Sequence, residues 1–201
     1  MIQVIAGKKG SGKTKRIIDM ANQASQESKH DIVFIDDDNR YMFDLRHEVR
    51  FINASEYELL SDHMFMGFLC GVVAQNFDVG LIFIDAFNKL IHNELATSEW
   101  VFKRLETISA NHSVDFVISV SAGPEELPDF IKPYVICRFQ RKNTSRDNHP
   151  LCFFERRIAV WHRERVTYNQ NNTCSAKHRS RSRELARNCQ DSTYTQVIYL
   201  S

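Results

Sequence analysis

The chain has 201 residues, of which 43% are apolar and 25% are charged, and its formal net charge is +1 at pH 7. These values are ordinary for a soluble globular protein, and the length suits one domain with an appendage. The longest apolar run, residues 64–74, is too short to span a bilayer. The first residues carry neither the basic leader nor the apolar core of a signal peptide. A membrane-spanning protein is therefore not expected, and the expected location is the cytoplasm.

The small net charge conceals two unlike parts of the chain. Residues 1–137 carry 8 Lys and 5 Arg against 20 Asp and Glu, a net charge of −7, whereas residues 138–201 carry 2 Lys and 11 Arg against 5 acidic residues, a net charge of +8. Apolar periodicity is regular before this boundary and poor after it. The sequence therefore predicts a folded domain over residues 1–138 and a basic, poorly ordered extension over residues 139–201.

The first predicted element is a short buried strand over residues 2–6. It runs into GKKGSGKT at residues 7–14, which fits the phosphate-binding pattern G-x-x-x-x-G-K-[ST]. Four fixed positions arise by chance in about 1% of chains of this length at average residue frequencies. A helix is predicted to begin near Gly12, with apolar residues at Ile17, Ile18, Met20 and Ala21. Strand, glycine-rich loop and helix form the context that this motif requires.

The loop residues suit a polyphosphate for physical reasons. Glycine tolerates positive φ and lacks a Cβ, so main-chain N–H groups can turn towards an anion, and the helix N-terminus adds a partial positive charge. Lys13 is predicted to contact the β- and γ-phosphates and Thr14 to ligate Mg²⁺. The predicted ATP-binding residues are Gly7, Lys8, Lys9, Gly10, Ser11, Gly12, Lys13 and Thr14. The alternative is a glycine-rich turn with no ligand.

The remaining predicted elements alternate between strands and helices. Strands are predicted over residues 31–36, 48–53, 79–85, 114–120 and 134–137, and helices over residues 55–75, 97–110 and 124–132. Ser55 is the predicted N-cap of the first of these helices, and Pro124 begins the last. This alternation predicts an α/β fold of three layers, with a mostly parallel sheet flanked by helices. In such folds ligands bind beyond the carboxyl ends of the strands.

The carboxyl ends of three strands carry polar side chains. Asp85 follows four apolar residues, the Walker B pattern, and is predicted to hold Mg²⁺ opposite Thr14; the alternative is a helix N-cap. Asp36, Asp37 and Asp38 follow the second strand. One of them is predicted to orient or deprotonate an attacking water, and the alternative is a solvated turn.

Two serines, Ser119 and Ser121, lie near the end of the fifth predicted strand. A polar side chain at that position can sense the γ-phosphate, and we take Ser121 as a candidate ATP-binding residue. The alternative is a pair of small residues that merely end a strand.

Residues 1–138 resemble P-loop NTPases of the RecA-like branch, and especially small bacterial ATP-binding proteins labelled PilT-like. The resemblance is carried by GKKGSGKT at 7–14, VFIDDDNRY at 33–41, LIFIDAF at 81–87 and FVISVSA at 116–122. It implies that Asp38 takes the place of a glutamate that follows the second strand, that Asp85 is the Walker B aspartate, and that Ser119 or Ser121 ends the next strand. It also implies ATP and Mg²⁺ as ligands, and homo-oligomers in which a neighbour supplies an arginine.

The chain departs from that family at two points. Asp38 replaces a glutamate, and Ala86 rather than an acid follows Asp85. We therefore predict a slow ATPase in which Lys13 and Asp38, or else Asp37, are the catalytic residues. A small-molecule or nucleoside kinase is an alternative, although no arginine-bearing lid is evident before residue 138. A non-hydrolysing, ATP-dependent switch or scaffold is another.

Residues 139–201 allow three interpretations. Their arginines can bind nucleic acid or another anionic surface. Cys174, His178 and Cys189 can form a metal site, although their spacing is not that of a standard zinc site. The segment can also be non-native sequence without a function, since the basic residues change abruptly from lysine to arginine.

Overall fold

The structure is a computed structural model that describes residues 1–123 and 125–139. Within these residues, six parallel strands form one sheet in the order β3-β2-β4-β5-β1-β6. The strands are β1 (Ile2–Gly7), β2 (Asp31–Asp36), β3 (Val49–Asn53), β4 (Val79–Ile84), β5 (Asp115–Val120) and β6 (Val135–Phe139). The helices are α1 (Lys13–Glu27), α2 (Asp62–Gln75), α3 (Phe87–Leu90) and α4 (Glu99–His112). Short 3₁₀ turns occupy Met42–Asp44, Ala54–Tyr57, Leu95–Thr97 and Lys132–Tyr134.

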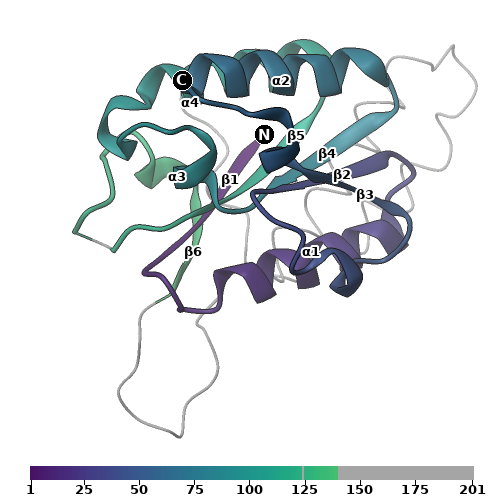
Figure 1. Ribbon diagram of the computed structural model, residues 1–201, viewed down its shortest axis with the longest axis horizontal. Coiled ribbons are helices and arrows are strands. Elements are labelled where there is room, and N and C mark those ends of the chain that lie inside the picture. Colours follow the sequence, from purple (N-terminus) through teal and green to yellow (C-terminus); the bar gives the residue numbers. More distant parts are fainter. Residues whose placement is uncertain (124, 140–201) are drawn as a thin grey trace, which may run out of the picture. The chain divides into compact units, whose positions relative to one another are not determined.

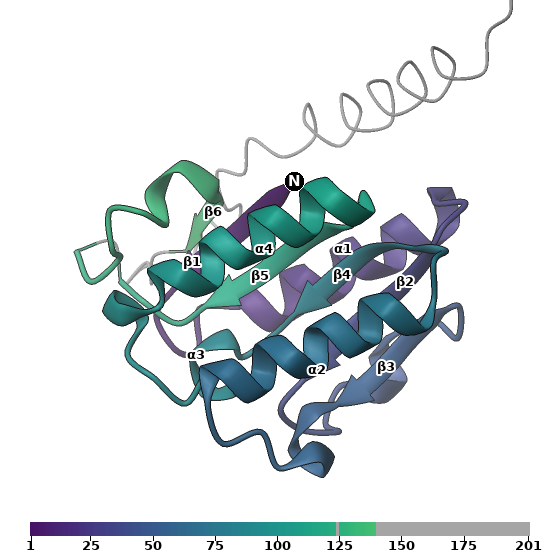
Figure 2. The ribbon, with the colours of Figure 1, turned by 90° about the horizontal axis from the view of Figure 1, so that it is seen from above.

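Helices cover both faces of the sheet, so the fold has three layers. Figures 1 and 2 show α2 and α4 on one face and α1 on the other. Alternate strand residues face opposite sides: Val33, Ile35, Ile82 and Ile84 belong to the core beneath α2 and α4. The residues between them, such as Phe34 and Phe83, are buried and stacked on the other face. The predicted three-layer α/β fold with a parallel sheet is confirmed.

The strands are buried on both faces because each carries an almost unbroken apolar run. Every residue of β4 and of β5 is buried, as is typical of parallel strands between two helical layers. Fully burying one phenylalanine contributes about 2–3 kcal/mol relative to an exposed one. No helix among residues 1–123 and 125–139 is long and apolar enough to span a membrane.

The predicted start of the second helix is wrong. Residues 54–57 form a 3₁₀ turn, Glu58 lies in the left-handed region with φ 47°, and α2 begins only at Asp62. The N-cap is Ser61, whose hydroxyl accepts the N–H of Met64 at 3.2 Å. Ser55 instead donates its hydroxyl to Asn53 at 2.8 Å.

This difference leads to a stability prediction. Ser61→Ala is expected to lower the free energy of unfolding by about 1 kcal/mol, because one N–H of the first turn of α2 loses its acceptor. Ser55→Ala is the matched control and is expected to change it by less than about 0.5 kcal/mol. Urea denaturation of the three proteins provides the measurement, and equal losses in the two variants would contradict the N-cap assignment.

The predicted helix over residues 124–132 is also wrong. Residues 125–131 contain turns and no helix, and Lys132–Tyr134 forms a single 3₁₀ turn before β6. Pro128 explains the difference, since proline inside a helix lacks the N–H that would pair with the preceding turn. The chain is instead held by i→i+3 bonds such as Ile131 N–H to the Pro128 carbonyl at 3.1 Å.

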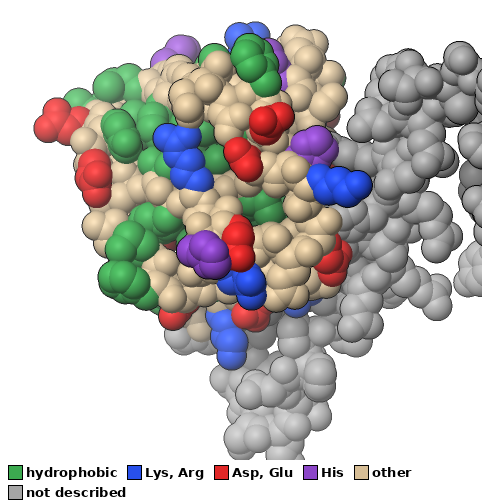
Figure 3. All heavy atoms as spheres, turned by 90° about the vertical axis from the view of Figure 1, so that its right-hand side faces the viewer, with side chains coloured by type: hydrophobic (Ala, Val, Ile, Leu, Met, Phe, Trp, Pro, Cys, Tyr) green, Lys and Arg blue, Asp and Glu red, His purple; other side chains and the backbone are tan. Residues whose placement is uncertain are grey.

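Acidic and basic groups are interspersed among the described side chains on the face that Figure 3 shows. A mixed surface of this kind produces no strong field of one sign. The predicted nucleic-acid binding, metal site and low order of residues 139–201 fall on residues of which only Phe139 belongs to the described part, as the last residue of β6. Those predictions therefore lie outside the described residues.

Candidate functional site

The loop between β1 and α1 has the local geometry of an anion-binding turn. Gly10 and Gly12 have positive φ angles of 78° and 94°, and Gly12 is the N-cap of α1. No side chain of the described residues caps that helix. The first-turn N–H groups of an uncapped helix need an external acceptor. An anion at this point supplies one and is favoured by the helix dipole.

Lys13 lies at the base of this loop. It is only 7% exposed, and its ammonium donates to the Lys8 carbonyl at 3.1 Å. Burial lowers the pKa of Lys13, and the nearby Asp85 carboxylate partly opposes this effect. Lys13 and Asp85 therefore share one electrostatic environment.

The sheet register brings three polar side chains side by side. Ile35 pairs with Ile84, and Ile84 pairs with Ile118; one residue further along, Asp36, Asp85 and Ser119 therefore lie next to one another. The isoleucines belong to the core beneath α2 and α4. Because side chains alternate between faces, the three polar residues lie on the α1 face, at the carboxyl edge of the sheet.

Asp85 is held by its neighbours. Its N–H donates to the Ile35 carbonyl at 2.9 Å, and one carboxylate oxygen accepts the hydroxyl of Ser119. The same hydroxyl oxygen accepts the N–H of Ala86 at 3.2 Å. The N-cap of α3 is Ala86, and no side chain of the described residues caps that helix, so Asp85 is not its N-cap.

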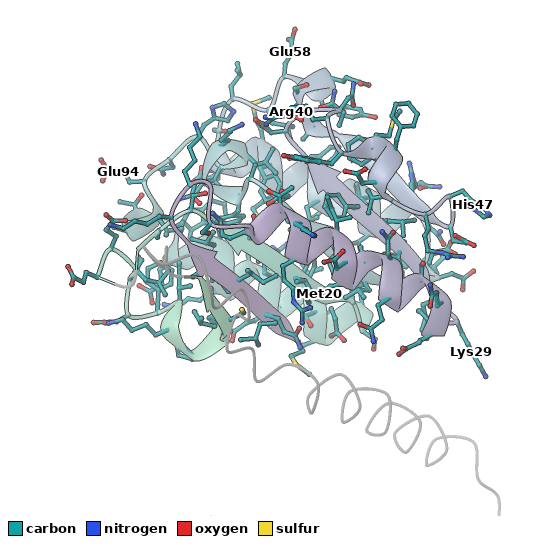
Figure 4. All side chains as sticks on the ribbon, turned by 90° about the horizontal axis from the view of Figure 1, so that it is seen from below. Met20, Lys29, Arg40, His47, Glu58 and Glu94 are labelled. Carbon is teal, nitrogen blue, oxygen red and sulfur yellow. The ribbon has the colours of Figure 1, made fainter. Side chains whose placement is uncertain are left out.

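The three consecutive aspartates have different environments. Asp38 forms an ion pair with Arg40, with Oδ2 at 2.6 Å from the guanidinium, and this pair lowers the pKa of Asp38. The Oδ2 of Asp37 pairs with Lys89 of α3. The other oxygen of Asp37 is buried and has no hydrogen-bond partner in the described part of the chain. In Figure 4, Arg40 projects on the same side of the molecule as Glu58, whereas Lys29 projects beyond the end of α1.

Asp36 is the aspartate that lies within the site. It is 4% exposed and accepts the N–H of Asp37 at 2.7 Å. Burial, with the charge of Asp85 as the next cause, raises the pKa of Asp36 to about 7. Two buried carboxyl groups in one environment cannot both ionise cheaply unless a cation joins them. Asp36 and Asp85 together therefore form a pair suited to a divalent cation.

The raised pKa predicts how stability depends on pH. Asp36 ionises near pH 4 in the unfolded chain and near pH 7 in the folded protein, so it lowers stability as pH rises through this interval. Asp36→Asn removes the effect. The free energy of unfolding of the variant relative to wild type is expected to rise by up to about 3 kcal/mol between pH 5 and pH 8.

Urea denaturation at the two pH values tests this expectation. The contribution of histidine titration to the free energy of unfolding is the same in both proteins and cancels in the difference between variant and wild type. Asp38→Asn is the matched control. Because the pKa of Asp38 is lowered, its replacement is expected to bring no gain at pH 8. A difference between Asp36→Asn and wild type that does not change with pH would contradict the assignment.

The structure brings together some of the predicted site residues and separates others. The glycines lie in the loop before α1, Lys13 and Thr14 are the first two residues of that helix, and Lys13 interacts electrostatically with Asp85. Ser121 lies in the loop after β5, where its N–H donates to the side-chain oxygen of Asn88 at 2.7 Å. The sequence offered Ser119 or Ser121, with Ser121 as the candidate, and Asp38 or else Asp37, whereas Ser119 and Asp36 are the residues in register with Asp85. The strand's period-two alternation was the signal that could have found them.

Ser11 adds an observation that concerns the ligand. Its hydroxyl oxygen is buried and has no hydrogen-bond partner among residues 1–123 and 125–139. Buried polar atoms are nearly always paired in folded proteins. An oxygen-rich ligand in the loop would supply the missing partner.

Two solved structures are among those that resemble this chain. No family model matches the chain, and no curated protein matches it. One similar solved structure is the flagellar accessory protein FlaH from Methanocaldococcus jannaschii, with a TM-score of 0.47 and 13% identity over 71% of this chain and 74% of that one. Another is domain III of the Thermotoga maritima replication initiation protein DnaA, with a TM-score of 0.39 and 18% identity over 69% of this chain and 54% of that one.

Proposed function

We propose that the protein binds Mg²⁺-ATP at the loop of residues 7–14 and hydrolyses it slowly. The observation that carries the proposal is the buried Lys13 ammonium, which lies in a glycine-rich loop at a helix N-terminus and interacts electrostatically with Asp85. A lysine is costly to bury unless anionic groups surround it. Phosphate oxygens in the loop would complete that environment.

The phosphates would be bound mainly by the main chain. Positive φ at Gly10 and Gly12 allows main-chain N–H groups of residues 8–14 to turn towards a phosphate. Lys13 would leave the Lys8 carbonyl, 3.1 Å away, and donate to a phosphate oxygen instead. A charge-assisted bond of this kind is roughly twice as strong as a neutral one.

The residues present also fit Mg²⁺. The donor set combines the hydroxyl of Thr14 with the buried carboxylate of Asp85, and hard oxygen ligands are those that Mg²⁺ prefers. Asp36 adds a second carboxyl next to Asp85 in register, and its pKa is raised by burial and by the charge of Asp85. When bound, Mg²⁺ supplies neutralisation of the charge on the phosphates.

Asp36 is our candidate for the residue that orients the attacking water. Asp37 and Asp38 are the residues predicted from the sequence, but Lys89 and Arg40 hold them. Asp36 is buried beside Asp85, and its carboxyl forms no ion pair among residues 1–123 and 125–139. Beside a bound cation its carboxyl would be ionised, and an ionised carboxylate can accept a hydrogen bond from water.

Phosphate release from Mg²⁺-ATP tests the proposal, with and without single-stranded nucleic acid. Slow release that disappears in Lys13→Ala supports it. Transfer of the γ-phosphate to a nucleoside or other hydroxyl compound would instead identify a kinase. Tight binding without any release over hours would identify a non-hydrolysing switch, an outcome that Ala86 beside Asp85 makes credible. Absence of any ATP binding would contradict all three.

A further inference from the structure

The short helix α3 begins two residues after Asp85, and two of its side chains belong to the core. Phe87 is fully buried and Leu90 is 4% exposed, and both belong to the hydrophobic core. The ring of Phe87 packs edge-on against those of Phe65 and Phe102. The helix is bounded by two non-glycine residues in the left-handed region, Ala86 at φ 52° and His92 at φ 47°. Each such residue costs about 1 kcal/mol or more. Non-glycine residues keep a positive φ only where the packing around them imposes that conformation.

The polar residues of α3 contact the loops that follow the two neighbouring strands. Asn88 accepts the N–H of Ser121 at 2.7 Å and donates to the Ser121 carbonyl at 3.4 Å. Lys89 pairs with Asp37. Because β4 lies between β2 and β5 in the sheet, α3 joins the loop after β2 to the loop after β5.

Asp85 is linked to α3 through the Ser119 hydroxyl. That hydroxyl donates to the Asp85 carboxylate and accepts the N–H of Ala86, the residue from which α3 begins. A cation on Asp85 would compete with the hydroxyl for the carboxylate. A shift in the position of the Ser119 hydroxyl would therefore alter its hydrogen bond with the N–H of Ala86 at the start of α3.

We propose that α3 couples occupancy of the site to both loops, with Asn88 and Lys89 as positioning residues: Asn88 holds residues 121–123 and Lys89 holds residues 37–40. This inference rests on the proposed function, since Mg²⁺-nucleotide is the ligand that selects the coupled arrangement. Coupling is reciprocal, so a variant that releases either loop also weakens nucleotide binding.

Hydrogen exchange measured by mass spectrometry tests the coupling. In the wild-type protein, Mg²⁺ with a non-hydrolysable ATP analogue is expected to slow amide exchange in residues 37–40 and 121–123 at least about threefold. In Asn88→Ala the response of residues 121–123 is lost while that of residues 37–40 remains. In Lys89→Ala the opposite pattern is expected.

The control variants separate coupling from general loosening. Lys103→Ala removes a lysine from an exposed ion pair with Glu99 on α4, 2.7 Å long, and is expected to leave both responses as in wild type. Asn88→Asp keeps an acceptor for the Ser121 N–H and is expected to restore the response of that loop. If Asn88→Ala does not fold, Lys89→Ala tests the coupling through its expected loss of response in residues 37–40.

Calorimetry on the same samples distinguishes the two ways of failing. If wild-type protein binds the analogue and both loops respond equally in wild type, Asn88→Ala and Lys89→Ala, the coupling is overturned and the proposed function stands. If wild-type protein does not bind the analogue, the proposed function fails and the coupling fails with it.

Discussion

Replacing Lys13 with alanine is expected to weaken ATP binding at least about 100-fold, which corresponds to about 2.7 kcal/mol. Lys13 is buried at the base of the loop and its ammonium is free to exchange the Lys8 carbonyl for a phosphate oxygen. A charge-assisted bond in a partly dehydrated site is worth about this much. Isothermal titration calorimetry with Mg²⁺-ATP measures the change directly.

Lys9→Ala is the matched control for this prediction. Lys9 lies in the same loop but is exposed, so its removal changes a charge near the site without removing a buried contact. A loss of less than about tenfold is expected, since exposed charges interact weakly through water. If Lys13→Ala binds ATP as tightly as wild type, the loop does not bind phosphate in the proposed way.

Asp85→Asn is expected to abolish the dependence of ATP binding on Mg²⁺. The asparagine keeps the shape of the side chain and can still accept the Ser119 hydroxyl, but it lacks the charge that a divalent cation needs. Affinity measured in EDTA is expected to stay within about threefold of wild type or to rise, because a negative charge near the phosphates is removed. Phosphate release is expected to fall at least about 100-fold.

Ser119→Ala accompanies this variant. Ser119 donates a hydrogen bond to Asp85 but is not itself proposed as a ligand. Its removal is expected to reduce the increase in ATP affinity that Mg²⁺ brings about tenfold, as does the loss of other residues that orient a metal ligand. Calorimetric titrations with and without Mg²⁺ on the three proteins give these ratios. If the ratio of the ATP affinities with and without Mg²⁺ were the same in Asp85→Asn as in wild type, the cation would not bind at Asp85.

The loop and the strands could be predicted because local residue choices determine them. The glycines at 10 and 12 are required by positive φ, and the apolar run of β4 is that of a strand covered on both faces. The order of the strands could not be derived in this way, because it depends on which strands meet in space. The position of Asp85 at the carboxyl edge followed from the alternation of strands and helices alone.

Other features depended on contacts between distant residues. The start of α2 was misplaced because Ser55 and Ser61 are equally good N-caps in sequence, and the left-handed Glu58 between them became apparent only in the fold. Pro128 was a signal against the helix at 124–132 that the sequence contained. The choice among the aspartates needed the partners Arg40 and Lys89, which are fixed by tertiary packing.

The central claim is that the main-chain N–H groups of residues 8–14, with Lys13, form a binding site for polyphosphate. A crystal structure of the protein with Mg²⁺ and a non-hydrolysable ATP analogue tests it most directly. The expected result is the β-phosphate within hydrogen-bond distance of those N–H groups and of Lys13, with Mg²⁺ between Thr14 and Asp85. An analogue bound elsewhere, or a loop that stays empty at saturating concentration, would contradict the claim.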